Sequence, residues 1–177
     1  MIPENMEIRA EEGYCLPAIM EILLKTFGYN DMDQWTIAQK LCELTRQDFS
    51  SFAKDGVIIK PDTLNAFFLR QGFKLHAQYT PFTEIYDEFA FECRLKNQCA
   101  QDSFVFCGYN YSWLFNKRNG TANHVSAICA VDSEFGKVVM FDPGPSNWWY
   151  KTVTIEDLWY ALKVAQAGIW CIKHSKN

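Results

Sequence analysis

The segment Glu12-Gly13-Tyr14-Cys15-Leu16-Pro17-Ala18 decides the first helix of the chain and places a cysteine at its start. Apolar residues recur after it with the spacing of one helical face, which predicts a helix of roughly three turns. Pro17 suits the first turn, because its missing N–H costs little there, and Gly28 suits a left-handed C-cap. The apolar face consists of Leu16, Ile19, Met20, Leu23, Leu24 and Phe27.

Cys15 is therefore expected at the N-terminal end of a helix. Backbone N–H groups and the positive end of the helix dipole favour a thiolate there, and the thiolate is the nucleophilic form. Free cysteine is also among the most buried residue types, so an unreactive core position is the alternative. Position alone leaves both interpretations open.

Composition bounds the class of protein. A chain of 177 residues with 49% hydrophobic residues predicts one globular domain, residues 1–177. The net charge of −4, with no cluster of Lys or Arg, argues against a nucleic-acid partner. No apolar run reaches the roughly 18 residues of a membrane span. The 16% aromatic content predicts a well-packed core, a groove lined with rings, or both.

The cysteines and the N-terminus favour a reduced, cytoplasmic protein, although export by a specialised route stays open. Residues 1–7 lack the basic and apolar regions of a secretory signal. The seven cysteines are scattered and odd in number, which is typical of free thiols. None of their spacings is C-x-x-C and only three histidines are present, so neither a structural zinc site nor another metal or cofactor site is expected.

The periodicity changes along the chain, from helical in the first half to short β-type runs in the second, which predicts an α+β fold. Thr154 and Asp157 resemble a capping box at the start of a late helix. Asp62 is expected to cap the third helix and Gly72 to end it. The other helices are expected at about 34–44 and 83–97, and the strands at 73–77, 103–109, 124–131, 137–142 and 168–172.

Two of these strands form a hairpin that brings a histidine to an aspartate. The loop Asp132–Gly136 is short enough to force antiparallel pairing. With the turn centred on Ser133 or Glu134, His124 lies opposite Asp142 or diagonal to it, on the same face. A one-residue bulge would move the two side chains to opposite faces.

An imidazole beside a carboxylate suits nucleophilic catalysis. His124 would take the proton of the Cys15 thiol and later protonate the leaving group, while Asp142 would fix the histidine tautomer. The alternative is that His124 only begins a strand and that Asp142–Pro145 is a simple turn. His76 and His174 are weaker candidates, because His76 has no acidic neighbour and His174 is expected in a frayed tail.

The remaining cysteines and aromatic residues also have both a structural and a functional interpretation. Cys42, Cys129 and Cys171 are expected in the core, and Cys107, before a glycine, is the only other candidate thiol. The ring-rich segments 109–115 and 147–150 are interpreted as loops that wall a groove, with core or oligomer contacts as the alternative.

These motifs, in this order, resemble the papain-like cysteine peptidases that trim double-glycine leaders from bacteriocins, and related free-standing domains. The matching segments are Gly13–Ala18, Asp55–Phe73, His124-Val125, Phe141–Gly144 and Thr154–Leu158. The resemblance implies a papain-like fold, with N-terminal helices packed on a mostly antiparallel C-terminal sheet. It also implies a cysteine hydrolase that cleaves a peptide or isopeptide bond of a peptide or protein substrate.

The chain departs from that family at two points. Tyr14 and Leu16 flank the cysteine in place of Asp and Gly, and Arg9 stands where the family has a glutamine that binds the oxyanion. The register of the nearest upstream amide, Asn5, does not match. These departures favour the alternative of a non-catalytic peptide-binding module on the same fold. A transamidase, deamidase or acyltransferase with the same Cys15, His124 and Asp142 is a further alternative, because the acceptor and not the triad decides the reaction.

Overall fold

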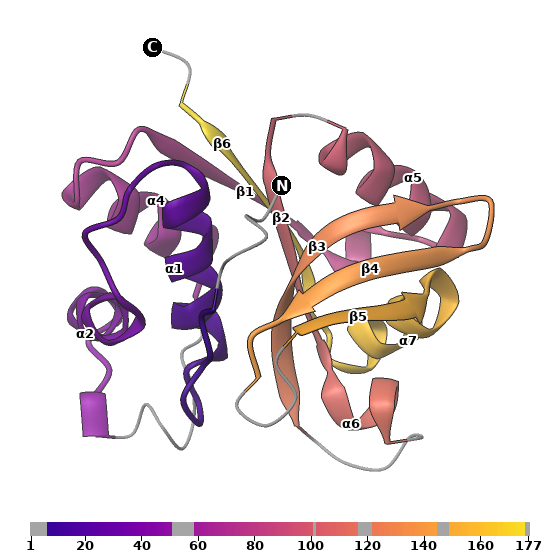
Figure 1. Ribbon diagram of the computed structural model, residues 1–177, viewed down its shortest axis with the longest axis horizontal. Coiled ribbons are helices and arrows are strands. Elements are labelled where there is room, and N and C mark those ends of the chain that lie inside the picture. Colours follow the sequence, from indigo (N-terminus) through magenta and orange to yellow (C-terminus); the bar gives the residue numbers. More distant parts are fainter. Residues whose placement is uncertain (1–6, 51–58, 101, 117–121, 145–148, 176–177) are drawn as a thin grey trace. The chain divides into compact units, whose positions relative to one another are not determined.

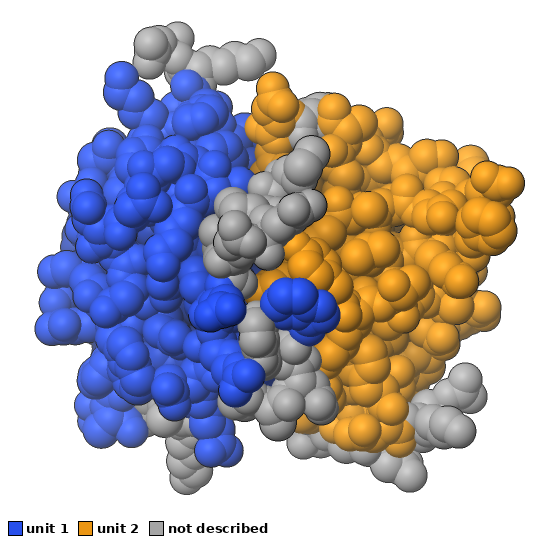
Figure 2. Space-filling view, viewed as in Figure 1, with its two compact units in different colours: residues 1–77, 143–149, 172–177 blue, residues 78–142, 150–171 orange. Residues whose placement is uncertain are grey.

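The structure is a computed structural model that describes residues 7–50, 59–100, 102–116, 122–144 and 149–175. These residues form helices and a six-stranded sheet, so the α+β prediction is confirmed. Its strands β2 (Phe104–Asn110), β3 (Asn123–Asp132) and β4 (Lys137–Asp142) pair antiparallel. The chain divides into two compact units. Unit 1 comprises residues 1–77, 143–149 and 172–177, and unit 2 comprises residues 78–142 and 150–171 (Figure 2).

Unit 1 is built on the cysteine helix. That helix, α1, spans Cys15–Thr26 and contacts α2 (Gln34–Thr45), which contacts α4 (Pro61–Arg70) in turn (Figure 1). Gly28 ends α1 with a φ of 86°. Its N–H and that of Tyr29 donate to the carbonyls of Lys25 and Leu24, at 3.0 and 2.9 Å, which is a Schellman motif. The predicted start and end of this helix are both confirmed.

The other helices of unit 1 correct one predicted cap. Helix α2, Gln34–Thr45, begins where the Asp33 carboxylate accepts from the Thr36 N–H at 2.8 Å. Helix α4, Pro61–Arg70, has Lys60 at its N-cap and Pro61 at its first position, so the prediction that Asp62 caps it was wrong. Asp62 lies instead in the first turn, where its charge still favours the helix dipole.

Unit 2 holds most of the sheet, whose strand order is β1-β6-β2-β3-β4-β5 (Figure 1). Helix α5 contacts β2 and β3, helix α7 contacts β2, and the two helices contact one another. Together they cover a core of buried apolar side chains. The strands are β1 Leu75–Pro81, β2 Phe104–Asn110, β3 Asn123–Asp132, β4 Lys137–Asp142, β5 Trp149–Thr154 and β6 Gly168–His174. The helices are η1 Phe82–Glu84, α5 Glu88–Cys99, α6 Tyr111–Phe115 and α7 Ile155–Val164.

The hairpin of β3 and β4 forms, with a turn different from the predicted one. Next to the turn Asp132 pairs with Lys137, and this register, if continued, would place Ala127 opposite Asp142 and His124 on the other face. The register shifts between Ile128 and Ala130, however, so that Ala127 pairs with Phe141. The bulge therefore does not break the His124–Asp142 pairing but restores it, because it cancels an offset in the turn.

Two further expectations were wrong, and one was confirmed. Helix α5 begins later than predicted, because the Asp87 carboxylate accepts from the Ala90 N–H at 2.7 Å and caps it. The ring-rich segments expected as loops are largely helix α6 and strand β5. The expected cap of α7 is confirmed, since Thr154 accepts from the Asp157 N–H at 3.0 Å. Expectations for residues 1–6, 55–57, 145 and 147–148 lie outside the described residues.

Gly168, at the start of β6, gives a test of this packing. A Cβ there would collide with the Thr80 carbonyl oxygen and lie 2.7 Å from the ring of Tyr79. Because backbone cannot yield cheaply, Gly168→Ala is expected to lower the free energy of unfolding by about 1–3 kcal/mol or more, measured by urea denaturation. Gly108→Ala should cost less, because its Cβ would be close only to the Ala167 methyl, at 3.0 Å, and the other atoms near it lie at 3.9 Å. Equal stability of both variants would contradict the packing.

Candidate active site

Cys15 is the first residue of α1 and its side chain is partly exposed. Gly13, with a φ of 79°, turns the chain into the helix, and the carbonyl of Tyr14 accepts from the Ala18 N–H at 2.9 Å. Tyr14 itself is buried and its ring lies 4.6 Å from that of Trp35 on α2. The prediction of a cysteine at a helix N-terminus is therefore confirmed, whereas its nucleophilic role stays a prediction.

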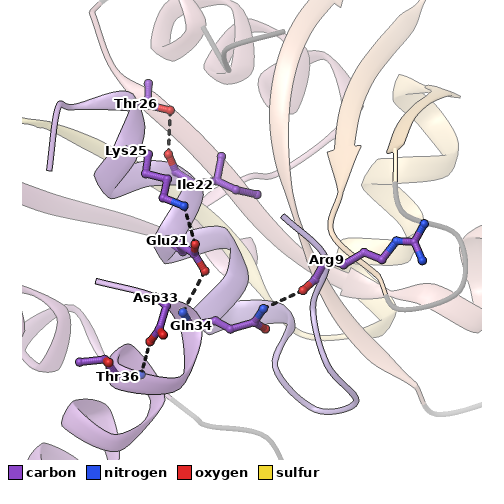
Figure 3. A network of polar contacts seen from close by, with 8 residues as sticks. All are labelled: Arg9, Glu21, Ile22, Lys25, Thr26, Asp33, Gln34 and Thr36. Atoms are coloured by element: carbon purple, nitrogen blue, oxygen red, sulfur yellow. Dashed lines mark hydrogen bonds and ion pairs between the residues drawn. The ribbon is translucent and has the colours of Figure 1, made fainter. Parts of the chain in front are cut away.

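A polar network in unit 1 fixes the segment that precedes the cysteine (Figure 3). The Gln34 amide donates to the Arg9 carbonyl at 2.7 Å and accepts from the Glu11 N–H at 3.2 Å. The N–H of Gln34 in turn donates to the nearly buried Glu21 carboxylate at 2.9 Å, and Lys25 pairs with the same carboxylate at 2.7 Å. Arg9, which stands where the resembled family has its oxyanion glutamine, is thus held through its carbonyl.

His124 and Asp142 contact one another directly in unit 2. The Nε2 atom of His124 lies 2.6 Å from Oδ1 of Asp142, and the aspartate side chain is fully buried. A carboxylate only accepts hydrogen bonds, so Nε2 carries the proton and Nδ1 is the basic nitrogen of the neutral ring. The predicted contact is confirmed, and its geometry suits an imidazole whose tautomer is set by a carboxylate.

Lys151 and Tyr111 complete the cluster. The sequence analysis missed Lys151, and it named Tyr111 only as part of a ring-rich segment that walls a groove, not as a contact of the charged pair. Lys151, on β5, donates to Oδ2 of Asp142 and lies 3.2 Å from the Tyr111 hydroxyl. Its ammonium also lies 5.1 Å from the ring centre of Tyr111 and 4.6 Å from that of Phe115. The available signal was a lysine inside a run of aromatic and β-branched residues, which indicates a charge with a buried partner.

Two tyrosine rings hold the imidazole in place. Tyr109 pairs directly with His124 across β2 and β3, and the rings meet edge-on at 5.8 Å. Tyr111 makes a second edge-on contact at 5.4 Å. The Tyr109 hydroxyl bonds to Ser126 at 2.8 Å, and burial, helped by the charge of Asp142, raises the pKa of Tyr109 well above its ordinary value. Tyr109 therefore stays neutral, and the ring of His124 has two fixed walls.

The weaker candidate residues lie elsewhere. His76 is exposed on β1, and His174 ends β6 with its ring 4.9 Å from Phe27, so the expected frayed tail is wrong at that residue. Cys107 is fully buried, and burial raises the pKa of its thiol to about 12. It is therefore not a candidate for reaction with an external substrate. Cys42 and Cys171 are buried as predicted, whereas Cys129 lies in β3 and is only partly buried.

Neither a metal centre nor a membrane helix emerges from the described parts of the chain. Within them, no three His, Cys, Asp or Glu side chains are grouped to hold a metal ion. None of the helices among those residues combines the length and the apolar character that crossing a bilayer requires.

No model of a known protein family matches the chain, and no curated protein matches it either.

Proposed function

We propose that the chain is a papain-like cysteine hydrolase that cleaves a peptide or isopeptide bond in a peptide or protein substrate. Cys15 is the nucleophile, His124 the base and then the acid, and Asp142 the residue that orients the histidine. The observation that carries the proposal is the 2.6 Å contact between His124 and a fully buried carboxylate. Such a pair fixes Nδ1 as the proton acceptor, which is what an activated nucleophile requires.

The chemistry follows from these roles. The Cys15 thiol gives its proton to His124, and the sulfur attacks the carbonyl carbon of the substrate. The C–N bond then breaks, and His124 returns the proton to the leaving amine, so that a thioester remains on Cys15. Water, deprotonated by His124, hydrolyses the thioester and restores the thiol. An amine in place of water would give transamidation, and a glutamine side chain as substrate would give deamidation.

The environment of Cys15 supports a role distinct from that of the other thiols. It combines partial exposure with a position at the start of a twelve-residue helix. By contrast, burial raises the pKa of Cys129 to about 12 and that of Cys99 to about 11. Cys93, which is also partly exposed but lies within α5, provides the matched control.

Alkylation by iodoacetamide at pH 7 tests the proposal. Cys15 is expected to react at least about tenfold faster than Cys93, because only a thiolate is an effective nucleophile. Mass spectrometry of peptides from the pulse-labelled protein gives both rates in one sample. In Cys93→Ser, alkylation of Cys15 can then be measured without alkylation of Cys93. Equal rates at Cys15 and Cys93 would instead favour the non-catalytic peptide-binding module.

A further inference from the structure

A second charged residue, Lys151, contacts the aspartate that binds His124. Asp142 shares its two oxygens between two partners, with Oδ1 on His124 and Oδ2 on Lys151. The lysine side chain is only 19% exposed and the aspartate side chain 0%. A buried carboxylate with one donor on each oxygen has a fixed rotamer, and its orientation toward the histidine depends on both donors.

The lysine is itself restrained on several sides. The Tyr111 hydroxyl lies 3.2 Å from its ammonium, and the rings of Tyr111 and Phe115 face the same charge. Tyr111 also packs edge-on against His124, so one residue contacts both partners of the aspartate. An ammonium held in this way cannot move off the carboxylate without losing all of these contacts.

The charge of Lys151 affects the histidine through the aspartate. When His124 takes up a proton, the cluster holds two positive charges and one negative charge. The ammonium partly neutralises the carboxylate and repels the imidazolium, so it weakens the hold of Asp142 on the added proton. A histidine that must return its proton to a leaving group benefits from this weaker hold.

We propose that Lys151 is a positioning residue that fixes the orientation of Asp142 and limits the proton affinity of His124. The inference deepens the proposed function, in which His124 acts first as base and then as acid. In the described part of unit 2, the titratable and charged groups around His124 and its aspartate include Asp142 on β4, Lys151 on β5, Tyr109 on β2 and Tyr111 on α6. Among these, Lys151 is the cationic side chain.

The test is an NMR titration of the ring nitrogens in the full-length protein labelled with ¹⁵N at histidine. In Lys151→Met the midpoint of the His124 titration is expected to rise by about one pH unit, because the positive charge that repels the imidazolium is gone. Lys151→Arg should return the midpoint close to that of the unsubstituted protein. His76 and His174 serve as internal controls, and their midpoints should not move.

Two features keep the test decisive. An unchanged His124 midpoint in folded Lys151→Met would overturn the proposal, as would a failure of Lys151→Arg to restore it. If Lys151→Met does not fold, Tyr111→Phe, which removes only the hydroxyl next to the ammonium, and Lys151→Arg carry the test through the Nε2 and Nδ1 shifts. In Tyr111→Phe those shifts should change in the same direction, by a smaller amount, and no change would count against the role of Lys151. The titration is run in a Cys15→Ser background as well, where no thiolate can couple to His124, so inactivity of the thiol would contradict the hydrolase and not this inference.

Discussion

Replacing His124 with alanine is expected to slow acetylation of Cys15 by p-nitrophenyl acetate by about 10²–10⁴-fold, the usual contribution of a positioned acid–base group. The activated ester acylates a thiolate without specific substrate contacts, so the unknown substrate does not limit the experiment. Without the imidazole, the thiol must lose its proton to solvent, and the thiolate fraction near neutral pH falls. The initial release of nitrophenolate and the mass of the intact protein report the reaction.

Each of the other two histidines supplies a matched control. His76→Ala and His174→Ala change exposed side chains outside the His124–Asp142 cluster, so both variants should acetylate at nearly the rate of the unsubstituted protein. A urea unfolding curve for each variant separates loss of chemistry from loss of structure. If Cys15 is acetylated as fast in folded His124→Ala as in these controls, its reactivity does not depend on His124. That result would contradict the proposed catalytic triad.

Local signals predicted the helix that begins with Cys15 and the strands that carry the histidine and the aspartate. Gly28 and Gly72 end their helices as expected, with φ values of 86° and 74°, because a left-handed C-cap depends only on neighbouring residues. Thr154 caps its helix for the same reason. Short-range geometry of this kind depends on a few adjacent residues, so it can be predicted directly from the sequence.

The rest of the candidate site depends on long-range geometry, which no local pattern specifies. The bulge between Ile128 and Ala130 decides which face His124 occupies, yet Ser126 to Val131 shows no glycine or proline that would mark it. Lys151 reaches Asp142 only because β5 lies beside β4 in the sheet. The sequence analysis placed the first part of that strand in a loop, and the lysine was therefore missed.

Replacing Asp142 with alanine is expected to lower the free energy of unfolding by about 3–5 kcal/mol at pH 7, the usual effect of removing one partner from a buried ion pair. Asp142 is fully buried, and its loss leaves the ammonium of Lys151, whose side chain is 19% exposed, without its carboxylate. His124 loses the acceptor at Nε2 in the same step. Urea denaturation followed by tryptophan fluorescence measures the change.

Adding Lys151→Met to Asp142→Ala measures how much of the lost stability comes from the unpaired charge and how much from lost packing. In Asp142→Ala/Lys151→Met no ammonium is left without its anion, so the double variant should be more stable than the sum of the two single effects by about 0.5–3 kcal/mol. The more exposed pair of Lys40 and Glu43, 3.5 Å apart on α2, gives a control cycle whose coupling should stay below about 1 kcal/mol. Strictly additive effects at Asp142 and Lys151 would mean that the two charges do not depend on one another. Lys151 could then not influence His124 through the aspartate, whatever the activity of the thiol proves to be.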